Sequence, residues 1–250
     1  MLLLPLLCAS LEAGAVRKSK AEGEFDSNML QIEEQNFLGK SAADVSVTTD
    51  EGIQPLSRLV NGNPTLLLLA YYSCSHSCPL TIKNLAKTEL DASTEDYNVL
   101  VLSFDERDTL ATMNDVRSSM EGLASNWTFG LLKPADARKL ADSVGFKYFF
   151  SEQDQIYVHP AVMVFLSPES QVMRYLFGAE PQAQDIELAL IESRNRSPRL
   201  NEIVDMVRLT CFQFDKSRSR YSLHPTIIFG GAGLGVLALV GIAAMMVKKD

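Results

Sequence analysis

Two cysteines and a histidine in the stretch YYSCSHSCPL, residues 71–80, are the residues of this chain best suited to chemistry. Cys74 and Cys78 are four positions apart, with His76 midway between them and Pro79 directly after. Thiolates at this spacing can form a structural disulfide, act as a redox dithiol, or bind a soft metal such as Cu(I) or Zn(II). The choice depends on the compartment, on the surrounding fold and on a third ligand elsewhere in the chain.

Strands alternating with helices are predicted around the cysteines. The apolar run TLLLLAYY, residues 65–72, predicts a buried strand that ends just before Cys74, and Pro79 suits the first turn of a following helix. The segment VSVTTDEGIQPL predicts an N-terminal hairpin. Further strands are predicted at 97–105, 126–132, 159–167 and 171–178, and further helices at 109–120, 134–145 and 181–196. This order predicts an α/β, thioredoxin-like fold with an N-terminal β-hairpin and the cysteines at the first strand-to-helix junction.

The predicted fold also indicates a third ligand. Sites in open α/β sheets lie at the carboxyl ends of strands, and a helix N-terminus at such a site lowers the pKa of a thiol. In a thioredoxin-like fold, the loop that enters the strand at 159–167 passes beside the dithiol. This places His159 opposite the cysteines, with Pro160 where a cis-proline is common. We expect His76 to point outward from its short loop and His224 to be an interfacial residue.

The two ends of the chain predict export and a membrane anchor. The uncharged run from Thr226 to Val247 is long enough to span a bilayer as one transmembrane helix. The apolar start ends in Ala13-Gly14-Ala15, which suits a signal peptidase site. The predicted units are a signal peptide at 1–15, a polar tether at 16–40, the thioredoxin-like domain at 41–197, an amphipathic helix and connector at 198–225, and the transmembrane helix at 226–247.

These ends predict a single-pass membrane protein with its domain on the extracytoplasmic side, in the periplasm or an equivalent space. Thiols in such an oxidising compartment need a reductant or a metal to persist. The formal net charge of −8 argues against general nucleic-acid binding, which requires a basic face. Cys8 would leave with the signal peptide, and Cys211 is expected to be a buried apolar thiol, with intermolecular pairing or a second copper contact as alternatives.

Four motifs in order resemble one family. The segments LLLLAYYSCSHSCPL, LSFDERDT, NWTFGLL and DQIYVHPAVMVFLSPESQV are similar to those of Sco/SenC copper chaperones, over roughly residues 45–195. The basic stretch before the membrane run is similar to the bacterial branch of the family that is anchored at the C-terminus.

The resemblance implies a function and a ligand set. It implies one copper ion, Cu(I) or Cu(II), bound by Cys74, Cys78 and His159 for assembly of the copper site of cytochrome c oxidase. The implied partners are the copper-site subunit of that oxidase, other copper chaperones and thioredoxin-like reductants. Asp105, Arg107 and Asp108 match the family's acidic and basic loop near the metal, with surface ion pairs as the alternative interpretation.

The chain departs from the family pattern at two places. Ser75-His76-Ser77 stand inside the cysteine pair, where the family commonly has a proline after the first cysteine, and this change brings His76 into consideration as a metal contact. Pro160 follows His159 in place of the more usual small polar residue, and this change can shift the imidazole. Neither departure removes a predicted ligand.

Three other functions stay open at this point. The first is a thiol:disulfide oxidoreductase that uses Cys74 and Cys78 without metal to keep the cysteines of an oxidase subunit reduced. The second is a peroxiredoxin-like peroxidase, which is disfavoured because the cysteines lack clear threonine and arginine partners. The third is a redox or copper sensor that signals through the membrane helix, which is disfavoured because only residues 248–250 follow the span.

Overall fold

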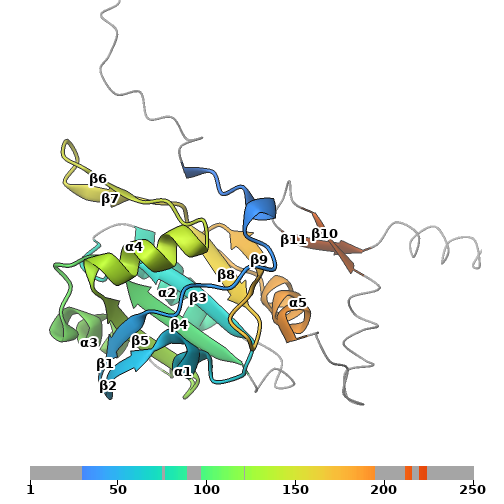
Figure 1. Cartoon of the computed structure of the whole chain (residues 1–250), viewed down its shortest axis with the longest axis horizontal. Coiled ribbons are helices and arrows are strands. Elements are labelled where there is room, and N and C mark those ends of the chain that lie inside the picture. Colours follow the sequence, from blue (N-terminus) through green and yellow to red (C-terminus); the bar gives the residue numbers. More distant parts are fainter. Residues whose placement is uncertain are drawn as a thin grey trace, which may run out of the picture.

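A seven-stranded mixed sheet forms the centre of the protein, in the order β2-β1-β5-β4-β3-β8-β9 (Figure 1). The computed structural model describes residues 30–74, 77–88, 97–120, 122–194, 212–215 and 220–223. The strands are β1 Ser46–Thr49, β2 Gly52–Pro55, β3 Thr65–Ala70, β4 Asn98–Ser103, β5 Trp127–Leu132, β8 Val162–Leu166 and β9 Val172–Phe177. β3, β4 and β5 are parallel, and the other pairs in this sheet are antiparallel. The arrangement agrees with the predicted thioredoxin-like fold and its N-terminal hairpin.

Strand β3 is the central strand that leads to the cysteines. All six of its residues are buried, because β4 and β8 flank it and both faces of the sheet are covered. Its register pairs Ala70, the last residue of β3, with Ser103, the last residue of β4. The loops that follow these two strands therefore begin side by side, at one edge of the sheet.

Helices cover both faces of the sheet. In Figure 1, α4 crosses the front of the sheet and α2 lies behind it. The helices are α1 Leu56–Val60, α2 Ser77–Lys87, α3 Leu110–Ser118, α4 Pro134–Ser143 and α5 Ala183–Arg194. Helix α3 begins with a capping box formed by Thr109 and Thr112, and α4 begins with Pro134, whose missing N–H is not needed there.

A second, two-stranded sheet stands apart from the first. Its strands β6, Phe149–Ser151, and β7, Ile156–Val158, form a hairpin that projects from the molecule near α4 (Figure 1). The sequence reasoning did not assign these residues to strands. The hairpin leads directly into His159 and then into β8, so it determines how the chain approaches the predicted histidine ligand.

The N-terminal boundary of the folded domain differs from the prediction. Residues 30–40, expected to belong to a tether with little structure, include a short 3₁₀ helix at Glu34–Asn36 and pack on the domain. Ile32 is buried, and the backbone N–H of Gly39 donates to the carbonyl of Val172 at 2.8 Å. The Phe37 ring lies so close to Gly145 that a Cβ there would be 2.5 Å from it.

The C-terminal part also differs from the prediction. Phe212–Asp215, expected to be the end of an amphipathic helix and the first residue of its connector, forms strand β10, which pairs with β11 at Arg220–Leu223. The rest of that predicted helix and the predicted signal peptide lie outside the described residues. Within the described ranges no helix has the length and apolarity to cross a bilayer. The span predicted at Thr226–Val247 lies outside these ranges.

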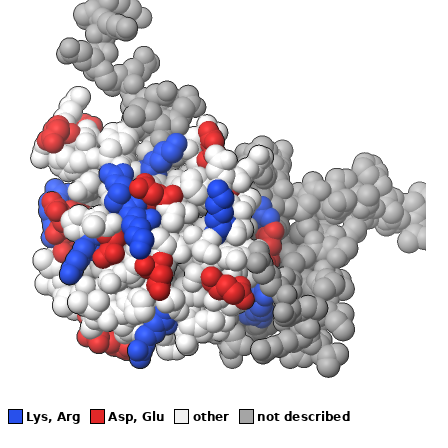
Figure 2. Space-filling model, viewed as in Figure 1, with Lys and Arg blue, Asp and Glu red and all other residues white. Residues whose placement is uncertain are grey.

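Charge on the visible face is mixed. Figure 2, drawn in the same orientation as Figure 1, shows basic and acidic side chains interspersed over α4 and the neighbouring surface. Neither sign dominates this face. Long-range attraction of a partner of one charge is therefore not expected here.

Candidate functional site

Cys74 lies in the turn between β3 and α2, as predicted. Its backbone N–H donates to the carbonyl of Tyr71 at 3.4 Å, and the residue is only 7% exposed. It lines a cavity of about 230 Å³ together with Tyr71, Ser73, Arg107, Gln155 and Ile156. This cavity lies between the cysteine turn and the β6–β7 hairpin, so a partner's side chain has room to approach Cys74.

The second cysteine lies at the start of α2. Cys78 is the second residue of that helix, but its side chain, like Ser75 and His76 as a whole, lies outside what the structure describes. Among the described side chains, no three of the types His, Cys, Asp and Glu form a metal site. The predicted set of Cys74, Cys78 and His159 includes an undescribed side chain, so the three-ligand site stays a prediction.

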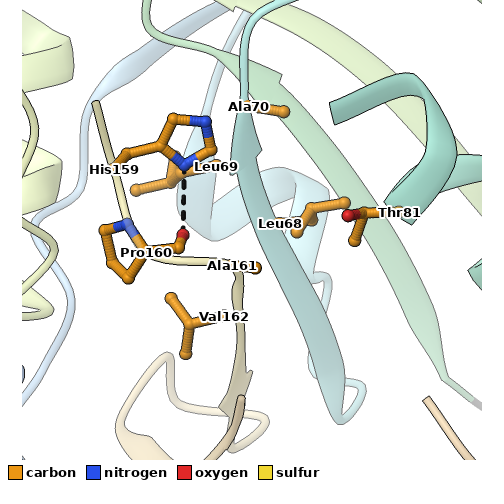
Figure 3. Close-up of a pocket in the computed structure, with 8 residues that line it drawn as sticks. All are labelled: Leu68, Leu69, Ala70, Thr81, His159, Pro160, Ala161 and Val162. Atoms are coloured by element: carbon orange, nitrogen blue, oxygen red, sulfur yellow. Dashed lines mark hydrogen bonds between the residues drawn. The ribbon is translucent and has the colours of Figure 1, made fainter. Parts of the chain in front are cut away.

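His159 connects the hairpin to β8, and its ring lines a small pocket of about 40 Å³ beside Leu69 and Ala70 at the end of β3 (Figure 3). Thr81 reaches the pocket from α2. The Nδ1 atom of His159 is 3.1 Å from the carbonyl oxygen of Pro160. A carbonyl only accepts hydrogen bonds, so this contact assigns the proton to Nδ1 and the metal-binding lone pair to Nε2.

Burial keeps the His159 imidazole neutral. Removal from water lowers the pKa of His159 below 6.5, against a smaller raising effect from the Pro160 carbonyl. A neutral imidazole is the form that binds metal ions. Pro160 stands where a cis-proline is common in this fold, but no peptide bond in the described ranges is cis.

Aromatic rings surround the imidazole. The ring centroids of Tyr71, Phe104 and Phe146 lie 5.9, 5.4 and 5.7 Å from that of His159. Tyr71 also accepts the N–H of Cys74 through its carbonyl. Tyr71 thus contacts the His159 imidazole through its ring and the Cys74 backbone through its carbonyl.

Asp108 holds the backbone that leads to Cys74. Its carboxylate accepts the N–H of Tyr72 at 2.6 Å and the N–H of Ser73 at 3.0 Å. It also accepts the hydroxyl of Ser103, at the end of β4, at 2.5 Å. Asp108 is 7% exposed, so these are buried, charge-assisted hydrogen bonds.

Asp105 and Arg107 form a second contact at the same edge. The guanidinium of Arg107 binds the carboxylate of Asp105 through Nε and Nη2, at 3.0 and 2.7 Å, and these hydrogen bonds raise the pKa of Arg107. The Asp105 side chain is fully buried, whereas that of Arg107 is 52% exposed. The Asp105–Arg107 contact is an ion pair, as the alternative interpretation of this loop has it, but both aspartates are buried and do not lie on the surface.

Arg107 also contacts the hairpin. Its guanidinium carbon lies 5.2 Å from the ring centroid of Phe150 in β6 and 5.4 Å from that of Tyr157 in β7. These are cation–π distances. Sequence reasoning missed both aromatic residues as part of the site, although aromatic residues on both sides of the polar run SEQDQ could have indicated a hairpin.

A family model covers the whole of this site. Residues 34–190, more than half of the chain, match the model described as SCO1/SenC. The chain belongs to the SCO1/SenC family. The resemblance drawn from the four sequence motifs is therefore correct at the level of the family. No curated protein matches the chain.

Solved structures agree with the fold of the SCO1/SenC family. A protein from Aquifex aeolicus is 29% identical, with a TM-score of 0.56 over 63% of this chain and 94% of the other. BsSco, described as a Sco family member with a disulfide switch and as one of the cytochrome c oxidase assembly proteins, is 17% identical, with a TM-score of 0.51 over 61% of this chain and 95% of its own. Yeast Sco1, solved with copper bound, is 12% identical, with a TM-score of 0.50 over 66% of this chain and 94% of its own. At these identities the last two similarities concern the fold alone.

Proposed function

We propose that this SCO1/SenC protein is a membrane-anchored copper metallochaperone for the copper-site subunit of cytochrome c oxidase. Family membership supports the proposal, since a yeast member has been solved with copper bound and BsSco is described among oxidase assembly proteins. The observation that carries it is the state of His159. Burial favours the neutral imidazole, and a proton on Nδ1 leaves the Nε2 lone pair for a metal ion beside the end of β3, the strand that leads to Cys74.

In this function copper is the cargo, which the residues of the chain bind and pass on. The thiolates of Cys74 and Cys78 select Cu(I) because they are soft ligands, and His159 is the third ligand. Burial lowers the pKa of His159 and so favours the neutral imidazole, the form that binds a metal ion. Three ligands leave the ion accessible, and a partner's thiolates can then replace them one at a time.

Competition for Cu(I) against a chromogenic chelator, with the full-length chain in detergent and a reductant present, tests the ligand set. We expect Cys74→Ser and Cys78→Ser to abolish stoichiometric binding. His159→Ala should weaken it about tenfold or more, because even changes next to a metal ligand cost about 10–100-fold. His224→Ala and His76→Ala, outside the proposed ligand set, should match the parent. Parental affinity in His159→Ala would contradict the three-ligand site.

A thiol:disulfide oxidoreductase that keeps the cysteines of an oxidase subunit reduced is the second candidate. The cavity beside Cys74 favours it, because a partner's cysteine could enter between the cysteine turn and the hairpin. This function predicts exchange with a mixed-disulfide peptide substrate without copper. His159→Ala would retain that exchange and Cys74→Ser would lose it, which separates the two candidates.

We also propose that the domain faces the extracytoplasmic side on a single C-terminal anchor. The uncharged run from Thr226 to Val247 and the apolar N-terminus support this topology. A membrane-impermeant maleimide added to intact cells should label Cys74 or Cys78 if the domain lies outside. Labelling only after the cells are lysed would contradict it.

A further inference from the structure

Asp108 is a buried carboxylate that belongs neither to the predicted ligands nor to the surface. One oxygen, Oδ2, accepts the N–H of Tyr72 at 2.6 Å and the hydroxyl of Ser103 at 2.5 Å. The other, Oδ1, accepts the N–H of Ser73 at 3.0 Å. Burying a carboxylate is costly unless such bonds satisfy it, so its position is strongly specified by these three donors.

The two peptide groups that Asp108 binds immediately precede Cys74. Strand β3 ends at Ala70, so Tyr72 and Ser73 lie beyond its hydrogen-bonded ladder with β4. Asp108 comes from 36 residues further along the chain and takes the place of a strand partner for this turn. The peptide groups before Cys74 are thus hydrogen-bonded to the buried carboxylate of Asp108.

Asp108 is itself held in place. Ser103, which donates to it, is the last residue of β4 and is fully buried. The N–H of Asp108 donates to the carbonyl of Asp105 at 3.1 Å, and Thr109 directly after it is the N-cap of α3. The carboxylate is therefore fixed from both sides, by the central sheet and by a helix start.

We propose that Asp108 is a positioning residue that fixes the backbone before Cys74, so that this thiol is presented in one place for copper binding or disulfide exchange. The assignment of copper as cargo rests on the proposed function, whereas the positioning of Cys74 does not. An amide cannot replace the carboxylate here, because either orientation of asparagine directs an NH₂ group at an N–H or O–H donor. Asp108→Asn keeps the shape of the side chain and removes the match between its two acceptor oxygens and the three donors.

The direct test is amide hydrogen exchange on the copper-free full-length chain. We expect Asp108→Asn to accelerate exchange at Tyr72 and Ser73 about tenfold or more, because charge-assisted hydrogen bonds are lost. Exchange in α5 should remain parental. Asp185→Asn is the matched control, since Asp185 has the same 7% exposure and lies in α5. Parental exchange at Tyr72 and Ser73 in Asp108→Asn, or equal acceleration in Asp185→Asn, would overturn the proposal.

The effect of Asp108 on the chemistry of Cys74 is measured through the stability of a disulfide with Cys78. In glutathione redox buffers, resolved by peptide mapping, the equilibrium constant for a Cys74–Cys78 disulfide should fall about tenfold in Asp108→Asn, because a looser turn lowers the effective concentration of one thiol at the other. Ser103→Ala keeps the charge of Asp108 and two of its three donors, and it also removes the acceptor of the Asp105 N–H at 3.2 Å, so a smaller change in the same direction is expected. An unchanged constant in both variants would overturn the proposal.

These outcomes are independent of the metal. If the parent chain binds no Cu(I), the proposed copper function fails, yet the exchange and disulfide measurements still decide the role of Asp108. If the parent binds Cu(I), Asp108→Asn should bind it about tenfold more weakly, and Asp185→Asn should bind it as the parent does. If Asp108→Asn fails to fold, Ser103→Ala carries the same comparisons, and parental values there would overturn the positioning role.

Discussion

The phenol of Tyr72 offers a quantitative test of how the cysteine turn is fastened to the sheet. This hydroxyl is buried between β4 and β5, within hydrogen-bond distance of the carbonyls of Val101 at 2.7 Å and of Gly130 at 2.9 Å. It accepts the N–H of Gly130 at 3.1 Å. Tyr72→Phe removes the hydroxyl and keeps the ring, so it isolates these contacts.

The expected loss follows from counting those groups. A buried N–H left without its partner costs about 1–3 kcal/mol, and the lost donated bond costs about 1 kcal/mol. Tyr72→Phe should therefore lower the free energy of unfolding by about 2–4 kcal/mol, a large share of the roughly 5–15 kcal/mol typical of a domain. Tyr175→Phe is the control, because its buried hydroxyl only donates to the carbonyl of Val144 at 2.9 Å, and should cost about 1 kcal/mol.

Guanidinium unfolding at pH 7 measures both variants. The single tryptophan, Trp127 in β5, lies three residues from Gly130 and reports on the affected strand through its fluorescence. Both variants should keep the parental dependence on denaturant, which shows that the unfolding transition itself is unchanged. If Tyr72→Phe costs no more than Tyr175→Phe, the three contacts of the Tyr72 hydroxyl do not fasten the turn.

Three further predictions follow from contacts at other points of the fold. Burial raises the pKa of Tyr72 and Tyr175 above 10. Their contribution to the free energy of unfolding is therefore complete below pH 10 and is lost above it, where the tyrosines of the unfolded chain ionise. The free energy of unfolding should fall less steeply from pH 8 to 11 in Tyr72→Phe than in the parent, and an unchanged slope would contradict this. Arg107→Gln removes the guanidinium over the hairpin aromatics and should speed chymotrypsin cleavage within residues 149–158 about 2–5-fold, as expected for about 0.5–1 kcal/mol. Arg117→Gln is the control, because the Arg117 side chain is also 52% exposed, and it should not speed this cleavage. Equal acceleration in both variants would disprove the role of the contact between Arg107 and the hairpin. Gly145→Ala should lower the unfolding free energy by about 1–3 kcal/mol, because φ is +69° and the new Cβ would meet Phe37. Gly122→Ala, with φ of +72° and open space, should cost less in thermal unfolding, and equal costs would show that Phe37 does not matter.

The sequence predicted the elements whose signal is local. The continuous apolar run at Leu66–Leu69 indicated a central buried strand, and Pro134 marked the start of α4, because both features act within a few residues. The position of His159 beside the first strand-to-helix junction followed from topology, since the order of elements determines which loops share an edge. The side chain of Cys78, His76 and the membrane span lie outside the described residues, so those predictions stand untested.

The elements that were missed depend on distant contacts or on ambiguous periodicity. The burial of Asp108 could not be foreseen, because its donors at Tyr72 and Ser73 are 36 and 35 residues away. The strands β6 and β7 have three residues each and pair with each other, so the aromatic residues on both sides of the polar run SEQDQ are the only local signal of this hairpin. Phe212–Asp215 alternates apolar and polar residues, a strand pattern that the longer helical spacing before it obscured.

The connection from β7 to β8 gives the site an asymmetric support. His159 follows Val158, the last residue of β7, so the imidazole and the projecting hairpin share one continuous stretch of backbone. Cys74, in contrast, follows a turn that Asp108 ties to the central sheet. The imidazole is therefore supported through the outlying hairpin, whereas the backbone before the cysteine is supported through the central sheet. The two predicted ligands thus depend on different parts of the fold, so a substitution in the hairpin and one in the central sheet should affect them separately.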